Sequence, residues 1–246
     1  MRIVDARCTI GDGRQSTLSA DELVRQLDEL GVDAAVVGPP DRCLAVYNRE
    51  GNDLIRTACA RHPGRLVGFA TVNPWYGEAA VDELRRAAAD GLAGLILHPP
   101  RQGFLLVDDV ADPVLEAAGE LGLPVYVGTG TPAYALPLQL TEVARRHPNV
   151  RFLMGHMGHS DFWIDSIPAA VAAPNIFAEV SYKQPHVIVA AVAALGPERV
   201  VYGSDAPFNA MRLELEKFME AGLTDRDREL VAGGTLLSLL PPGTLS

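Results

Sequence analysis

The feature that most constrains the fold of this chain is a unit that recurs along its length. A short apolar run rich in Val, Ile and Leu is followed by a loop, a longer amphipathic segment, and a turn of Gly, Pro or Asn. The apolar runs are residues 2–8, 34–38, 66–72, 93–98, 124–128, 150–155, 176–181 and 200–204. Most are continuous rather than alternating, which indicates strands that are covered on both faces in a parallel sheet.

Amphipathic segments between these runs predict helices. They span residues 19–30, 77–90, 112–121, 137–147, 161–172, 185–195 and 210–221. The first begins with Ser19 and Glu22, a capping box, and stops at Gly31, a typical C-terminal glycine. Eight strands that alternate with helices predict an α/β fold, a single (β/α)8 TIM barrel over residues 1–246. The doubly wound alternative usually carries GxGxxG after its first strand, and DARCTIGDG lacks that spacing.

Composition narrows the class of partner. The net charge of -10 repels nucleic acid and anionic membranes, so a small-molecule substrate is expected instead. No apolar stretch approaches the roughly 18 residues of a membrane span, and the opening MRIVDARC does not resemble a signal peptide. The cysteines Cys8, Cys43 and Cys59 form no CxxC pair and are expected to be reduced thiols. These features predict a cytoplasmic protein.

Active sites of this fold lie at the carboxyl ends of the strands, so the residues that end each run are the candidates. Several runs there resemble the amidohydrolase-related family of metal-dependent hydrolases and non-oxidative decarboxylases. The matching segments are IVDA at residues 3–6, GLILHP at 94–99, LPVYV at 123–127, FLMGHMG at 152–158 and RVVYGSDAPF at 199–208. The resemblance implies a metal held by an HxH pair on strand 1, by histidines on strands 5 and 6, and by an aspartate on strand 8. That metal would activate a water and polarise the substrate, while the aspartate moves a proton.

This sequence departs from that pattern at three positions. Arg7 and Thr9 stand where the HxH pair is expected, and Gly128 stands where strand 5 would offer a histidine. Only His156 and Asp205 keep the residue types of the family. A permanently charged Arg7 repels a dication and cannot ligate it. We therefore expect no tightly bound metal as cofactor, and zinc or another divalent ion at His98, His156 and Asp205 is the disfavoured alternative.

Arg7 suggests a different chemistry, because its planar guanidinium matches a carboxylate or phosphate. In this interpretation Asp205 is the general base and His156 an electrophilic or proton-transferring partner. Arg7, His98, Arg101 and Tyr182 are the expected substrate contacts. Two alternatives stay open: Arg7 forms only a structural salt bridge to Asp5, Asp205 or Glu179, and His98 only caps the end of its strand.

Three functions are compatible with these residues. The first is a hydrolase of a small, anionic lactone, ester or amide without a firmly bound metal. The second is a catalytically silent barrel that binds a small molecule or pairs with an active homologue. Decarboxylation ranks third, because that reaction relies on the metal to hold the carboxylate. A homodimer is also expected, on the resemblance and on the apolar segment 236–240, although this segment is equally suited to a last helix that packs on the barrel.

Overall fold

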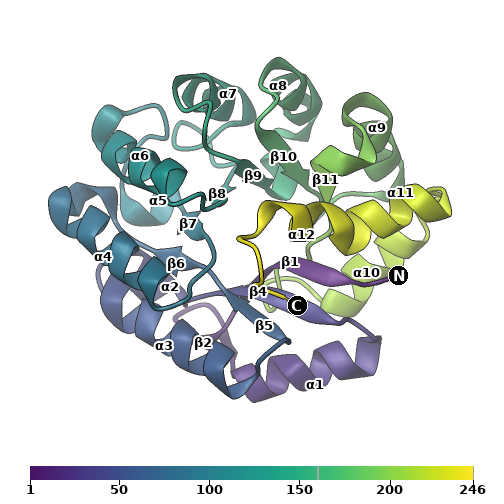
Figure 1. Ribbon diagram of the computed structural model, residues 1–246. Helices are drawn as coiled ribbons and strands as arrows, with labels where there is room; N and C mark the ends of the chain where they lie inside the picture. The colour runs from purple at the N-terminus through teal and green to yellow at the C-terminus, as the bar shows by residue number, and fades with distance from the viewer. Residues whose placement is uncertain (160, 246) are drawn as a thin grey trace.

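A ring of parallel strands lies inside a ring of helices in the computed structural model, which describes residues 1–159 and 161–245 (Figure 1). The strands of the ring, in order, are β1 (Val4–Thr9), β4 (Ala34–Gly38), β5 (Leu66–Gly68) continued by β6 (Ala70–Thr71), β7 (Leu95–Leu97), β8 (Val125–Gly128), β9 (Phe152–Gly155), β10 (Ile176–Glu179) and β11 (Val200–Val201). Each pairs in parallel with its neighbours. Phe69, which separates β5 from β6, still donates its N–H to the carbonyl of Val37 at 2.9 Å.

The ring closes where the first strand meets the last. The N–H of Ala6 donates to the carbonyl of Tyr202 at 3.0 Å, and Cys8 forms a parallel bridge with Ala206. Backbone groups of both edges are thereby satisfied, which removes the open edges that a sheet would otherwise have. The predicted (β/α)8 barrel is confirmed.

Helices cover the outside of the ring (Figure 1). The longer ones are α1 (Ala20–Leu30), α3 (Asn48–Arg61), α4 (Glu78–Ala89), α6 (Asp112–Glu120), α7 (Pro137–Arg146), α8 (Ser166–Ala172), α9 (Pro185–Leu195) and α10 (Met211–Met219). Short elements fill the connections: the hairpin β2 (Gly11–Asp12) and β3 (Thr17–Leu18), and the helices α2 (Asp41–Ala45), α5 (Pro99–Gln102), α11 (Asp225–Glu229) and α12 (Thr235–Leu239). Single turns of other helix types are η1 (Pro74–Tyr76), η2 (Asp109–Ala111), η3 (His156–Gly158), η4 (Trp163–Asp165), η5 (Pro197–Arg199) and η6 (Leu230–Gly234).

Local sequence signals explain both ends of α1. The Ser19 hydroxyl accepts the N–H of Glu22 at 3.2 Å, and Gly31 ends α1 with a left-handed backbone at φ 68°, as the capping pattern predicts. The segment 161–172 is helical in its second part only, because α8 begins at Ser166 after the turn η4. Helix α3 is not among the helices that the sequence predicts. None of the described helices is long and apolar enough to cross a bilayer.

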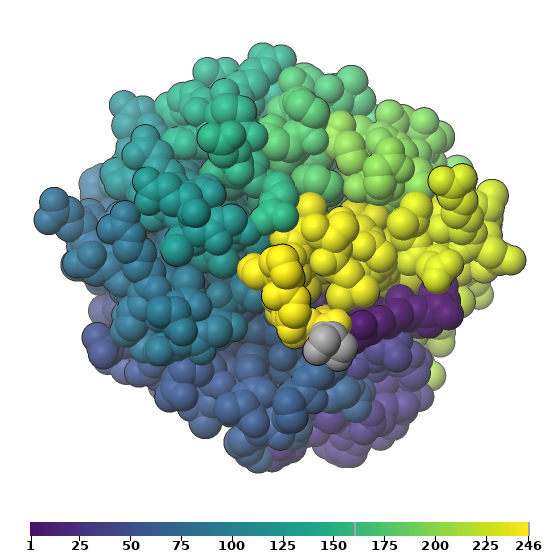
Figure 2. All heavy atoms as spheres, in the orientation of Figure 1, coloured from purple at the N-terminus to yellow at the C-terminus, as the bar shows by residue number. Residues whose placement is uncertain are grey.

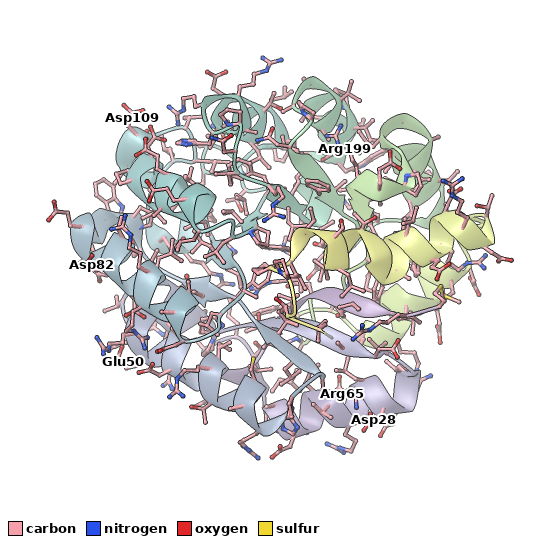
Figure 3. The ribbon with its side chains drawn as sticks, in the orientation of Figure 1. Asp28, Glu50, Arg65, Asp82, Asp109 and Arg199 are labelled. Carbon is pink, nitrogen blue, oxygen red and sulfur yellow. The ribbon has the colours of Figure 1, made fainter. Side chains whose placement is uncertain are left out.

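An ion pair of Arg65 and hydrogen bonds of Arg199 join the outer helices to the ring. Arg65, just before β5, pairs with Asp28 of α1 at 2.6 Å, and the two side chains lie together at the rim in Figure 3. Arg199, just before β11, donates to the carbonyls of Ala170, Ala173 and Ile176. Such exposed pairs contribute little stability individually, on the order of 0–1 kcal/mol, so the apolar core carries the fold.

The core has two layers, one between the strands and the helices and one inside the ring. The inner layer includes Val4, Ala34 and Ala93 at the amino ends of their strands, together with Leu236 and Leu239 of α12. Helix α12 therefore closes the amino-terminal end of the barrel, and its atoms lie against the N-terminal strand in Figure 2. The apolar segment 236–240 is thus largely buried within the chain and gives no support to the predicted homodimer, which stays a prediction.

Candidate functional site

A pocket of about 330 Å³ opens at the carboxyl ends of the strands. All six side chains predicted from the sequence as catalytic or substrate-binding line it, namely Arg7, His98, Arg101, His156, Tyr182 and Asp205. They come from β1 and from the loops that follow β7, β9, β10 and β11, so the barrel ring is what brings them together.

Arg7 and Asp205 form an ion pair in this pocket. The Arg7 Nε lies 3.7 Å from Asp205 Oδ1, and both side chains are more than nine-tenths buried. The guanidinium lies over the Tyr126 ring at 5.3 Å, a cation–π contact that supports it from one side. Arg7 Nε makes no hydrogen bond among the described residues, although it is the nitrogen through which the guanidinium pairs with Asp205. Arg7 thus pairs with Asp205 and also lines the pocket, where its guanidinium can meet an anion.

Hydrogen bonds of its side chain and its backbone hold Asp205 in addition to that pair. Tyr182 donates its hydroxyl to Asp205 Oδ2 at 3.0 Å, and the Asp205 N–H donates to the carbonyl of Arg7 at 3.0 Å. The N–H of Phe208 in turn donates to the Asp205 carbonyl at 2.9 Å. Burial raises the pKa of the Asp205 carboxyl above its ordinary value, while Arg7 and the Tyr182 hydroxyl oppose that rise.

Buried Asp5 sets the distance between the first and last strands at the site. Its Oδ1 accepts the N–H of Arg7 at 3.0 Å and the N–H of Ser204 at 2.9 Å. One carboxylate thereby fixes the residue at Arg7 and the residue before Asp205. Desolvation by burial raises the pKa of Asp5 to about 6.

His156 lies near the same carboxylate oxygen of Asp205 that accepts the Tyr182 hydroxyl. Its Nε2 is 4.0 Å from Asp205 Oδ2, and its Nδ1 is 2.8 Å from the Ser181 hydroxyl. Its backbone has φ 61°, a left-handed conformation that is uncommon for a residue other than glycine. Burial lowers the pKa of the imidazole to about 4, so His156 is neutral at pH 7.

His98 occupies the space that Gly128 leaves open. A Cβ at position 128 would lie 3.2 Å from His98 Cδ2, so any larger residue there would press on this ring. The His98 side chain makes no helix-capping hydrogen bond at the start of α5, and its buried Nδ1 has no partner within the described part of the chain. The alternative that His98 only caps the end of its strand stays a prediction. Burial lowers its pKa to about 3, so the ring is a neutral lining group.

Arg101 lies at the mouth. It pairs with Asp41 at 3.6 Å, hydrogen-bonds to the Gln15 side chain, and lies over the Phe208 ring at 5.8 Å. Because these contacts already engage its guanidinium, Arg101 is a weaker anion contact than Arg7.

Comparison with known proteins identifies the family. The model of the amidohydrolase family matches residues 13–235. The chain belongs to the amidohydrolase family. A gamma-resorcylate decarboxylase from Rhodococcus jostii (strain RHA1) is 25% identical to it, in a match that covers 79% of this chain and 76% of that protein.

Solved structures agree with this amidohydrolase fold. A 2,6-dihydroxybenzoate decarboxylase complexed with 2,6-dihydroxybenzoate has a TM-score of 0.78 at 16% identity, covering 97% of this chain and 98% of that one. The 5-carboxyvanillate decarboxylase from Sphingomonas paucimobilis has a TM-score of 0.79 at 18% identity, with the same coverage. These three relatives are named as decarboxylases, and decarboxylation is the reaction that ranks third among the functions expected from the sequence.

The amidohydrolase family implies a metal, and the residues of this chain do not fit one. Within residues 1–159 and 161–245, no three His, Cys, Asp or Glu side chains are grouped so that they could hold a metal ion. The alternative set His98, His156 and Asp205 is therefore not assembled as a ligand shell. The guanidinium of Arg7 stands beside Asp205, where it places a positive charge against any cation.

The sequence does not predict the roles of two side chains of this amidohydrolase site, Tyr126 and Ser181, although Ser181 ends the run 176–181 and is therefore a strand-end candidate. Tyr126 supports Arg7 from inside the barrel, and Ser181 contacts His156. Strand alternation offers a signal for Tyr126, since it shares the inward face of β8 with Gly128. The sequence analysis considers Glu179 only as a partner of Arg7, whereas its carboxylate bonds to Tyr126, His156 and Ser181.

Proposed function

We propose that this protein decarboxylates a small hydroxy-aromatic carboxylic acid without oxidation, with Arg7 in the place that a metal holds in the family. The observation that carries the proposal is the buried guanidinium of Arg7, which lines the pocket beside Asp205. The names of the relatives supply the class of acid.

The pocket suits a single-ring acid. Its volume of about 330 Å³ lies at the small end of the range for ligand sites, roughly 300–1,000 Å³. Arg7 offers a planar fork that binds a carboxylate through charge-assisted hydrogen bonds. The Tyr182, Ile96 and Phe208 side chains contribute apolar surface to the walls against which a ring can lie.

Asp205 supplies the proton. A substrate carboxylate on Arg7 lies next to the Asp205 carboxyl, and two neighbouring carboxylates favour uptake of a proton by one of them. The protonated Asp205 then donates to the ring carbon that bears the carboxylate. The bond between that carbon and the carboxylate breaks, its electron pair returns to the ring, and carbon dioxide leaves. The ring hydroxyl donates electron density that stabilises the protonated ring, and the net change is the replacement of a carboxylate by a proton.

Hydrolysis of a small anionic lactone, ester or amide is the second candidate, with Asp205 as the base. His156 Nε2 and Asp205 Oδ2 are 4.0 Å apart on the pocket wall, a spacing at which both can contact one water. In this case the carboxylate of the substrate is bound away from Asp205, because the base must stay ionised.

The test uses protein purified without chelator or added metal. Its zinc, manganese and iron contents are measured, and 2,6-dihydroxybenzoate, 5-carboxyvanillate and a panel of lactones and esters are assayed by chromatography. We expect loss of carbon dioxide from an aromatic acid, substoichiometric metal, and no turnover by Asp205→Asn. Asp109→Asn, an exposed carboxylate at the rim, is the matched control (Figure 3).

Three other outcomes of this test would each contradict a part of the proposal. Near-unit metal occupancy with activity that a chelator abolishes would overturn the role of Arg7. Hydrolysis of a lactone without decarboxylation would establish the second candidate. Binding of the acids without any turnover would identify a silent binding protein or a partner subunit.

A further inference from the structure

Glu179 is a buried carboxylate that does not line the pocket and yet bonds to two residues that do. Its side chain is fully buried at the end of β10. Its Oε2 accepts the Tyr126 hydroxyl at 3.0 Å, the Ser181 hydroxyl at 2.9 Å and the His156 N–H at 2.9 Å, while its Oε1 accepts the Ser181 N–H at 2.6 Å. Four donors thus form hydrogen bonds to this carboxylate. A buried carboxylate needs such hydrogen bonds to offset its loss of water.

These contacts determine where the protons of the network lie. A carboxylate only accepts hydrogen bonds, and a serine hydroxyl has a single proton. The Ser181 hydroxyl therefore gives its proton to Glu179 and has only lone pairs for His156 Nδ1, 2.8 Å away. An unprotonated Nδ1 would place two lone pairs against each other. Nδ1 must therefore carry the proton, and in a neutral ring Nε2 is then bare.

We propose that Glu179 and Ser181 are positioning residues that fix His156 as the Nδ1–H tautomer and present an unprotonated Nε2 to the pocket beside Asp205. Nε2 then accepts a hydrogen bond from a hydroxyl of the bound substrate or from water. The proposal deepens the proposed function, and its activity test rests on that function.

Two further observations support this assignment. Glu179 also binds the backbone N–H of His156, which has the left-handed φ of 61°, so the same carboxylate anchors both the ring and its unusual backbone. Burial keeps the imidazole neutral, since its pKa is lowered to about 4. A tautomer is defined only for a neutral ring, and at pH 7 this condition holds.

The direct test is nuclear magnetic resonance of the full chain with its six histidines labelled with nitrogen-15. Long-range proton–nitrogen correlations distinguish the two neutral tautomers, and His156→Gln assigns the signals. We expect wild-type His156 to be the Nδ1–H form. Ser181→Ala should convert it to a mixture or to the Nε2–H form, and Ser181→Thr should restore the Nδ1–H form. Ser166→Ala removes a buried hydroxyl that does not contact His156 and should change nothing.

An Nε2–H wild-type ring would overturn the proposal, and so would an unchanged ring in Ser181→Ala. If Ser181→Ala fails to fold, the wild-type spectrum alone still decides the tautomer. The spectra are recorded without substrate, so a protein that turns over none of the acids leaves the result unaffected. Where activity is found, Ser181→Ala should lower kcat about 10- to 100-fold with little change in KM, and Ser181→Thr should recover it.

Discussion

Replacing Arg7 by Met tests the ion pair on which the proposed site depends. The substitution keeps an unbranched side chain but removes the positive charge that pairs with Asp205. Among the described residues, the other group within ion-pair distance of Asp205 is His156, which is not a permanent cation. Breaking a buried pair by removing one partner costs roughly 3–5 kcal/mol, because the remaining charge is left in a poorly solvated place. The Asp205 side chain is 8% exposed and borders an open pocket, so water relieves part of that cost. We therefore expect a loss of about 3 kcal/mol in the free energy of unfolding at pH 7.

The sign of the pH dependence follows from the pKa of Asp205. Burial raises that pKa in the folded state, so the folded protein binds a proton more readily than the unfolded chain and the ionised carboxylate is destabilising. Arg7 opposes this rise, so the pKa of Asp205 should rise further in Arg7→Met. The deficit of the variant should then shrink as the pH is lowered from 7 toward 5 and the carboxyl becomes protonated.

Urea unfolding at both pH values measures these differences, and a double-mutant cycle isolates the pair. Asp205→Asn introduced into Arg7→Met should recover most of the lost stability at pH 7, since no buried charge then remains. Equal stability of Arg7→Met and Arg7→Met/Asp205→Asn would refute the reasoning, as would a deficit that does not change with pH.

Three further predictions concern residues around the site and the core. Tyr182→Phe removes a hydrogen bond that lowers the pKa of Asp205, so the limb of the activity–pH profile that reports Asp205 should move to higher pH, and an unmoved limb would contradict this role. Asp5→Asn should flatten the pH dependence of the unfolding free energy between pH 4 and 6, where a folded pKa of about 6 makes wild-type stability fall as the pH rises. Leu236→Ala should cost about 2–5 kcal/mol in thermal or urea unfolding because its side chain is fully buried at the end of the barrel, whereas half-exposed Leu213→Ala should cost far less.

The pattern of apolar runs was sufficient to predict the barrel and the end of the barrel at which the site lies. Parallel strands buried on both faces leave a continuous apolar signature, and β4 coincides with the predicted run 34–38. The sequence does not predict helix α3, because Gly51 interrupts the amphipathic pattern of this segment. A Cβ at Gly51 would lie 2.5 Å from the Cβ of Cys43, so packing against α2 requires a residue that weakens the helical signal.

The residues of the site were predictable one at a time, but their contacts were not. Strand ends and the family resemblance predict Arg7, His156 and Asp205. The His98 ring, which follows β7, fills the space beside Gly128 of the neighbouring strand β8. No spacing in the sequence predicts this contact. The role of Ser181 depends on the direction of one hydroxyl between two side chains from different strands, and only the folded geometry defines it.

The contact between Arg7 and Asp205 depends on closure of the ring, in which the first strand joins the last. Asp5 and Ser204 are 199 positions apart in the chain, and their hydrogen bond places Arg7 against Asp205. Contacts between such distant segments form only after a large loss of chain entropy, so they come late when a chain folds. A growing polypeptide that lacks its last strand has the guanidinium without its carboxylate partner. Arg7 and Asp205 therefore come together only when the first strand joins the last one.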